Sequence, residues 1–445
     1  MSDISEDKPQ GTEGYPPLGY SWYVVILLTL GYILSFLDRN ILVLLVEPIK
    51  AEFALSDTQI GLLMGLAFSI FYATMGIPLG WLADNMKRRT LVAAGMFVWS
   101  IATCLSGFTK SFGALFTARV AIGAGEATLS PCAISLISDM FPEGKRARAI
   151  AVYSCALSIA AAFSFKLGAE ILNWANTTDT SEMFLIGGLK PWQIVFVIVG
   201  APGVVLSAFM MFVKEPKRQQ VKKLDEKPIK FRQTIAYYKE NRGGFLGISL
   251  LVGVMTIIAY SQGFSAAMFE RTWGWTASEY GSRNSVGLLL FGPPTVLFAG
   301  WLIDRLHTKG VEDAAFKVFK VGLYIMIPFN AAFPLMPDPW VALIVSFIGI
   351  IGIATVTAAG VPAILKVIPG KIRGQSIAIY YMIISLSGLL LGPTTVGVIS
   401  DALGDPSLLR YAVAAVPAFF GTLALIFLPM ISGKYLAQIK KEITI

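Results

Sequence analysis

Charged side chains are scarce in this sequence of 445 residues. Asp, Glu, Lys and Arg make up 14% of the chain, whereas 55% of the residues are hydrophobic. A soluble protein of this size needs roughly a quarter of charged residues to cover its surface. The composition therefore excludes an ordinary water-soluble fold and indicates that lipid forms part of the solvent of this protein.

Cysteine and histidine are also few. Cys104, Cys132 and Cys155 all lie within apolar runs, so we expect small core residues and no disulfide or metal ligand. The only histidine, His307, falls in a predicted loop. A membrane-embedded enzyme would need a nucleophile–base pair or a metal constellation, and a G-x-x-x-x-G-K-[ST] loop for ATP is absent from the sequence. We therefore expect no enzymatic activity, no cofactor and no metal.

Apolar runs of about 20 residues recur along the whole chain, and this is the length at which a helix crosses the hydrocarbon core. The sequence predicts an all-α polytopic membrane protein with twelve transmembrane helices. The predicted helices span residues 20–46, 58–83, 90–108, 112–138, 147–172, 192–213, 243–270, 277–303, 314–335, 339–365, 374–400 and 408–432.

Lys and Arg concentrate in alternate loops, and cytoplasmic loops carry such an excess. The basic loops hold Lys87, Arg88, Arg89, Lys145, Arg146, Arg148, ten further Lys and Arg residues within 214–242, and Arg305, Lys309, Lys366, Lys371 and Arg373. This pattern predicts that both termini are cytoplasmic, in the inner membrane if the source is bacterial. The net charge of +8 then reflects topology and contact with membrane lipids, and no nucleic acid is expected.

The longest polar stretch, 214–242, has six predicted helices on each side. We predict a disordered cytoplasmic tail at 1–19, a six-helix bundle at 20–213, a cytoplasmic linker at 214–242, a second bundle at 243–432 and a cytoplasmic tail at 433–445. An internal repeat supports the two halves, since Gly80-Trp81-Leu82-Ala83-Asp84 recurs as Gly300-Trp301-Leu302-Ile303-Asp304. Parallel repeats of this kind place a substrate site between the halves, near the membrane midplane.

Two segments carry a family resemblance. Residues 80–89 (GWLADNMKRR) meet the loop pattern G-x-L-A-D-x-x-x-R-R, and residues 119–126 (RVAIGAGE) meet R-x-x-x-G-x-G-E. Over residues 20–430 the chain resembles the major facilitator superfamily, and with residues 36–39 (FLDR) it is similar to the Spinster branch, transporters of lysophospholipids and sphingosine-1-phosphate. The resemblance implies two pseudo-symmetric six-helix bundles, a monomer and a lipid-like substrate.

Six ionisable residues of the N-terminal predicted helices are candidates for a functional role, because an ionised group at the bilayer centre costs about 3 kcal/mol. They are Asp38, Arg39, Arg119, Glu126, Lys166 and Glu170. The helical rise of 1.5 Å per residue puts Asp38 level with Arg119, so we expect that pair, with Arg39 leaning toward Glu126. Either Asp38 and Glu126 carry protons, tuned by Arg119 and Arg39, or the charges form a static lock between two helices. Lys166 and Glu170 fit an interfacial pair as well as a substrate role.

The predicted function is secondary active transport by alternating access, coupled to protons, of an amphipathic lipid-like molecule. The alternatives are a drug or organic-anion transporter of the same fold and, remotely, a membrane-embedded enzyme. The predicted substrate-binding residues are Arg39, Arg119, Glu126, Tyr32, Phe36, Tyr153, Tyr260 and Tyr380. The predicted conformational gate, where the superfamily stabilises its outward-open state, consists of Gly80, Asp84, Arg88, Arg89, Asp139 and Asp304.

Overall fold

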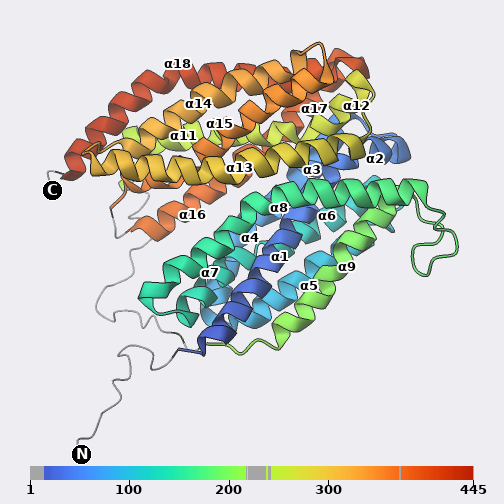
Figure 1. The fold of residues 1–445 in the computed structure, drawn as a ribbon, viewed down its shortest axis with the longest axis horizontal. Helices are drawn as coiled ribbons and strands as arrows, with labels where there is room; N and C mark the ends of the chain where they lie inside the picture. Colours follow the sequence, from blue (N-terminus) through green and yellow to red (C-terminus); the bar gives the residue numbers. More distant parts are fainter. Residues whose placement is uncertain (1–14, 217, 219–236, 239–241, 370–371, 444–445) are drawn as a thin grey trace, which may run out of the picture.

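The computed structural model describes residues 15–216, 218, 237–238, 242–369 and 372–443. All regular secondary structure within these residues is helical (Figure 1). Eleven segments are long and apolar enough to cross a membrane. The 35-residue helix α8 (Glu143–Thr177) is long enough as well, which brings the crossings in the described residues to the predicted twelve.

Each half of the chain contributes six of these crossings. The N-terminal half consists of α1 (Leu18–Leu44), α2 (Val46–Phe53), α3 (Asp57–Met64), α4 (Leu66–Asn85), α5 (Arg88–Ser106), α6 (Phe112–Glu126), α7 (Leu129–Met140), α8 and α9 (Pro191–Met211). The C-terminal half consists of α11 (Arg242–Ser261), η1 (Gln262–Phe264), α12 (Ser265–Trp273), α13 (Ala277–Thr308), α14 (Ala314–Ala332), η2 (Phe333–Leu335), α15 (Pro339–Leu365), α16 (Arg373–Ile383), η4 (Ile384–Leu391), α17 (Gly392–Leu403), η5 (Pro406–Leu408) and α18 (Leu409–Ile443).

The two halves lie side by side with their helices running across the view of Figure 1. Helix α18 ends at the left of that view and α1 begins at the bottom, left of the centre, and we call this side the terminal end. Elements α2, α3, α12 and α17 meet at the right, which we call the joined end. The basic loops of the sequence lie at the terminal end, because they connect α4 to α5, α7 to α8, α13 to α14 and α15 to α16.

Among the described residues, the hydrophobic core is shared between the halves mainly toward the joined end. One buried cluster there combines Leu37 and Ile41 of α1 with Phe264, Phe269 and Val413 of the C-terminal half. A second cluster belongs wholly to the C-terminal half. The third belongs to the N-terminal half apart from contributions such as Leu389. Burial therefore stabilises the contact between the halves at one end of the molecule more than at the other.

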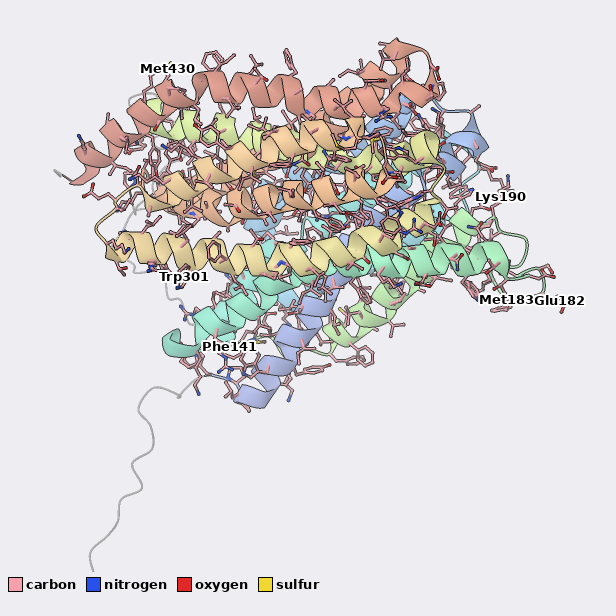
Figure 2. All side chains as sticks on the ribbon, turned by 45° about the horizontal axis from the view of Figure 1, so that its top comes forward. Phe141, Glu182, Met183, Lys190, Trp301 and Met430 are labelled. Carbon is pink, nitrogen blue, oxygen red and sulfur yellow. The ribbon has the colours of Figure 1, made fainter. Side chains whose placement is uncertain are left out.

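Apolar side chains also cover the outward-facing helix surfaces. Figure 2 shows Trp301 on α13 and Met430 on α18 among the side chains at the periphery, and they are 50% and 51% exposed. Leu250 and Leu297 are 67% and 69% exposed. A surface of this kind is stable only in lipid, in agreement with the membrane class predicted from composition.

Glycines allow the halves to touch backbone to backbone at the joined end. A Cβ atom on Gly65, at the break between α3 and α4, would lie 2.4 Å from the Leu389 carbonyl oxygen. A Cβ atom on Gly397 would lie 2.3 Å from the carbonyl oxygen of Asp57. Any larger residue would push the helices apart, as expected for glycine-mediated helix packing in membranes.

The eleventh crossing is not a continuous α-helix. Residues Ile384–Leu391 form the π-helix η4, whose Ser387 Oγ lies 3.1 Å from Thr256 Oγ1 on α11. Gly388 packs there as well, since its Cβ would lie 2.6 Å from Thr256 Cβ. Such π segments are rare and occur often at functional sites.

The C-terminal helix extends beyond the predicted boundary at residue 432. Helix α18 continues to Ile443, so most of the expected tail 433–445 is helical. The physical reason is polar and apolar packing: Tyr435 Oη donates to the Ala363 carbonyl oxygen at 2.8 Å, and Gln438 Nε2 donates to that of Val367 at 2.9 Å. At the other end, α1 already begins at Leu18. Of the predicted tail 1–19 and linker 214–242, residues 1–14, 217, 219–236 and 239–241 lie outside the described residues.

Candidate functional site

A buried ion pair joins α1 to α6 in the middle of the N-terminal half. Both Nε and Nη2 of Arg39 lie 2.6 Å from Glu126 Oε2. Ser35, one turn before Arg39 on α1, donates its hydroxyl to the same oxygen at 2.6 Å. The Glu126 side chain is fully buried, whereas that of Arg39 is 14% exposed. The expected approach of Arg39 to Glu126 is therefore confirmed.

The second expected pair takes a different form. Arg119 on α6 donates through Nη1 to the backbone carbonyl oxygen of Asp38 at 3.0 Å, and no ion pair joins it to the Asp38 carboxylate. The prediction of that ion pair was wrong, although the two residues do meet. Helical phase explains the difference: Asp38 and Arg39 are adjacent, so their side chains leave α1 in different directions. Among the described residues, Asp38 Oδ1, Arg119 Nε and Glu126 Oε1 are buried without a hydrogen-bond partner.

Aromatic rings surround the guanidinium of Arg39. Its Cζ atom lies 5.0 Å from the ring centroid of Phe36, 4.6 Å from that of Phe68 and 4.8 Å from that of Tyr72. Such contacts add cation–π attraction to the ion pair and hold the guanidinium plane in one orientation. Arg119 lies farther from Phe68, at 6.0 Å.

A cavity of about 280 Å³ opens beside these arginines, between the two halves. Of the predicted substrate-binding residues, Arg39, Arg119 and Tyr260 line it. The other five do not line it, and they are Glu126, Tyr32, Phe36, Tyr153 and Tyr380.

The aromatic residues among those five pack against other side chains of their own half. Tyr32 stacks on Tyr153 with ring centroids 5.0 Å apart and contacts Phe36 at 5.1 Å. Tyr380 is 3% exposed and belongs to the core of the C-terminal half. The predicted aromatic lining is therefore mostly packing around the site.

The C-terminal half gives the cavity uncharged polar groups that sequence reasoning missed. Gln262, Asn284, Asn330 and Ser346 line it, together with apolar residues such as Phe333 and Leu389. No Asp or Glu occurs among the described lining residues. An uncharged amide inside an apolar helix is a weaker sequence signal of a functional site than a charge is. Its transfer into lipid is still unfavourable, and this would have been a reason to consider these residues.

Polar contacts between the halves gather at the joined end. Asp57, at the first position of α3, accepts hydrogen bonds from Arg271 of α12 at 2.7 and 2.8 Å and from Ser400 of α17 at 2.6 Å. The carboxylate of Asp401 accepts from the backbone N–H groups of Asp57 and Thr58 at 2.9 and 2.8 Å, where the positive end of the α3 dipole favours an anion. We call Asp57, Arg271, Ser400 and Asp401 the latch. Neither Asp57 nor Arg271 is among the residues that the sequence predicts for the site.

The terminal end holds a cluster within the N-terminal half. Arg88 donates to Asp139 at 2.5 Å and to Glu215 at 2.9 Å, and Arg89 donates to the Val213 carbonyl oxygen at 2.7 Å. The predicted gate residues Arg88, Arg89 and Asp139 thus come together, with Glu215 as a member that was missed.

The rest of the predicted gate does not join that cluster. Asp304 is exposed and pairs with no described cation. Gly80 and Asp84 belong to α4, but their side-chain environment lies outside what the structure describes.

Two further predictions concern the pair Lys166 and Glu170 and the binding of metal ions. Lys166 and Glu170 form an i,i+4 pair at 2.5 Å with both side chains more than half exposed, as in an interfacial pair. Among the described residues, no group of three or more His, Cys, Asp or Glu could hold a metal ion.

Comparisons with known proteins find similarity to membrane transporters. The model of the Major Facilitator Superfamily matches residues 28–311. An MFS-type efflux pump of Mycolicibacterium smegmatis is 27% identical over 388 residues, which cover 86% of each chain. A probable L-galactonate transporter of Escherichia coli is 30% identical over 183 residues, 41% of this chain and 37% of that protein.

A solved structure is similar over nearly the whole chain. It is the crystal structure of a bacterial homologue of the human lysosomal transporter Spinster, in an inward-facing and unoccupied conformation. The TM-score is 0.80 at 26% sequence identity, and the match covers 96% of this chain and 98% of that one. The resemblance to the Spinster branch is therefore present in the structure as well as in the motifs.

Proposed function

This chain belongs to the major facilitator superfamily, and we propose that it is a proton-coupled secondary active transporter of an amphipathic anion. The observation that carries the proposal is the charge of the central cavity. Arg39 and Arg119 line it, and no carboxylate does among the described lining residues. In a low-dielectric site, two guanidinium groups favour a carboxylate or a phosphate.

We infer proton coupling because the Glu126 carboxylate and a bound substrate anion would share the guanidinium of Arg39. Glu126 Oε2 accepts from both Nε and Nη2 of Arg39. A bound anion competes for the same guanidinium, so the buried carboxylate loses part of its charge compensation. Uptake of one proton by Glu126 restores neutrality in the low-dielectric interior. Asp38, which is 2% exposed, is the second candidate carrier. The alternative is a static lock between α1 and α6.

A lysophospholipid or a sphingosine-1-phosphate-like molecule is the first substrate class that we propose. Its phosphate matches the arginines, and apolar residues such as Phe165, Leu288 and Ile350 line the same cavity. The similarity to the Spinster homologue favours this class. The cavity of about 280 Å³ accommodates a headgroup, so an acyl chain would extend beyond it.

A compact organic acid is the second candidate, and the cavity volume favours it. A six-carbon sugar acid would fit entirely within about 280 Å³. The similarity to the probable L-galactonate transporter supports this class, whereas similarity to the efflux pump keeps a drug-like anion in consideration.

We propose that the terminal end is cytoplasmic and that the molecule works as a monomer in the cell membrane. The basic loops gather at this end, as expected for the cytoplasmic side. The latch then closes the outer side, and alternating access requires it to open while the terminal end closes.

Transport into liposomes tests the proposal. The purified protein is reconstituted, and uptake of labelled lysophosphatidate, sphingosine-1-phosphate and L-galactonate is followed with and without a pH gradient. The variants are Glu126→Gln and Asp38→Asn. Glu170→Gln serves as the control, because it removes a carboxylate that is more than half exposed and does not line the cavity.

Each outcome has a distinct meaning. Uptake that depends on the gradient in the wild type and in Glu170→Gln, but not in Glu126→Gln, supports proton coupling. Uptake that is indifferent to the gradient contradicts the coupling and leaves a static lock. A folded protein that transports none of these anions would contradict the proposed substrate class.

A further inference from the structure

Asn284 on α13 is a buried amide that lacks a protein partner. The residue is 6% exposed and lines the central cavity. No described residue forms a hydrogen bond with its side chain. The great majority of buried polar side chains have a partner, because an unsatisfied buried amide costs folding free energy. The two donors and the acceptor of Asn284 are therefore available to a molecule in the cavity.

A second amide faces the same space from α14. Asn330 is 3% exposed, and its Nδ2 donates to the Met326 carbonyl oxygen at 2.7 Å. A Cβ on Gly349 would lie 2.8 Å from that nitrogen, so the glycine lets the amide pack closely on α15. Its Oδ1 receives no hydrogen bond from a described residue. Gln262, by contrast, is already engaged, because its Oε1 accepts from Ser265.

Asn284 and the two arginines lie at similar depths in opposite walls. Arg119 is seven residues from the start of α6, and Asn284 is seven residues from the start of α13. Both helices start at the joined end, so each residue lies about 10 Å from it. Arg39 is five residues before the end of α1, at about 8 Å.

From this arrangement we propose that the substrate is a hydroxylated anion that bridges the two halves. Its charged group binds Arg39 and Arg119, and a hydroxyl nearby on the same molecule binds Asn284 with support from Asn330. A hydroxyl both donates and accepts, as the free amide of Asn284 does. The inference rests on the proposed function and adds a specificity-determining residue to it. Glycerol-based lysolipid headgroups and sugar acids share this chemistry.

Binding of matched ligands to the full chain in nanodiscs tests the inference. One pair is oleoyl-lysophosphatidate and its 2-deoxy analogue; the other is L-galactonate and hexanoate. The wild type is expected to bind the hydroxylated member of a pair about tenfold more tightly. Asn284→Leu keeps the size of the side chain and is expected to remove that difference without weakening the unhydroxylated member. Ser285→Ala is the control on the same helix, because the Ser285 hydroxyl donates to the Ser282 carbonyl oxygen and does not line the cavity.

The results separate the inference from the proposed function. A preference for the hydroxyl in the lipid pair alone, lost in Asn284→Leu, assigns the site to a lysolipid; the same result in the acid pair alone assigns it to a sugar acid. If Asn284→Leu weakens both members of a pair equally, or leaves the preference intact, the inference is wrong while anion binding stands. If Arg39→Gln binds every anion as tightly as the wild type, the proposed function itself fails.

Discussion

Asp57 and Arg271 join the two halves of the molecule through a two-point contact. Nη1 of Arg271 lies 2.7 Å from Oδ2 of Asp57, and Nη2 lies 2.8 Å from Oδ1. The two side chains are 3% and 8% exposed, so water screens the pair weakly. Arg271 also donates through Nε to Glu47 at 2.8 Å. This arginine holds α2, α3 and α12 together.

We expect Arg271→Gln to favour opening at the joined end. The substitution leaves the buried carboxylate of Asp57 without its fork-shaped partner, at a cost of about 3 kcal/mol to the closed arrangement. Spin labels on the exposed residues Ala51 and Ala402 report the separation of α2 from α17 by electron double resonance. Arg283→Gln is the matched control, because Arg283 stacks between Trp275 and Trp340 of one half. An unchanged distance distribution in Arg271→Gln would show that the latch contributes little.

Gly397→Val is expected to prevent closure at the same end. Its Cβ would lie 2.3 Å from the Asp57 carbonyl oxygen, a backbone atom that a rotamer change cannot move. We predict a longer distance between labels on Ala51 and Ala402 and at least a tenfold loss of transport. Gly300→Val is the control, since no atom lies within 4 Å of a Cβ there. Normal transport by Gly397→Val would contradict the requirement for backbone contact.

Arg39→Lys tests whether the shape of the cation matters. Lysine keeps the charge, but it cannot offer two nitrogens to Glu126 Oε2 or stack on the rings of Phe68 and Tyr72. We expect anion affinity to fall by about tenfold to a hundredfold, measured as the Kd of lysophosphatidate in nanodiscs. Equal affinity in the variant would reduce the role of Arg39 to that of a point charge.

Arg88→Ala is expected to destabilise the N-terminal half. The side chain is 1% exposed and lies between Asp139 and Glu215, so its removal takes the shared cation from two carboxylates. We predict a loss of about 3 kcal/mol, observed as a lower midpoint of thermal unfolding in detergent. Lys87→Ala, at an exposed neighbouring position, is the control. A midpoint equal to that of the control would contradict the structural role of Arg88.

The sequence was most informative where a single helix fixes the geometry. The constant rise of α1 and α6 correctly placed Asp38 and Arg119 at one depth, where they meet through the Asp38 carbonyl oxygen, but it did not give the ion pair that was expected of them. Helical phase was harder to read, which is why Tyr380 was assigned to the cavity although it lies in a core. The latch depends on how α3 meets α12 and α17, and residues such as Asp57 and Arg271 give no local sign of that contact. Asn284 was missed because it carries no charge.

The last helix has a consequence for the synthesis of the protein. Gln438 accepts a hydrogen bond from the backbone N–H of Gly244 at the start of α11 and donates to the Val367 carbonyl oxygen after α15. Ile439, the next residue, is 2% exposed. The C-terminal half therefore completes its packing only after residues 438 and 439 have left the ribosome, whereas the N-terminal half has all its helices much earlier. A tag fused near residue 440, or a truncation there, would therefore disturb the packing of the C-terminal half.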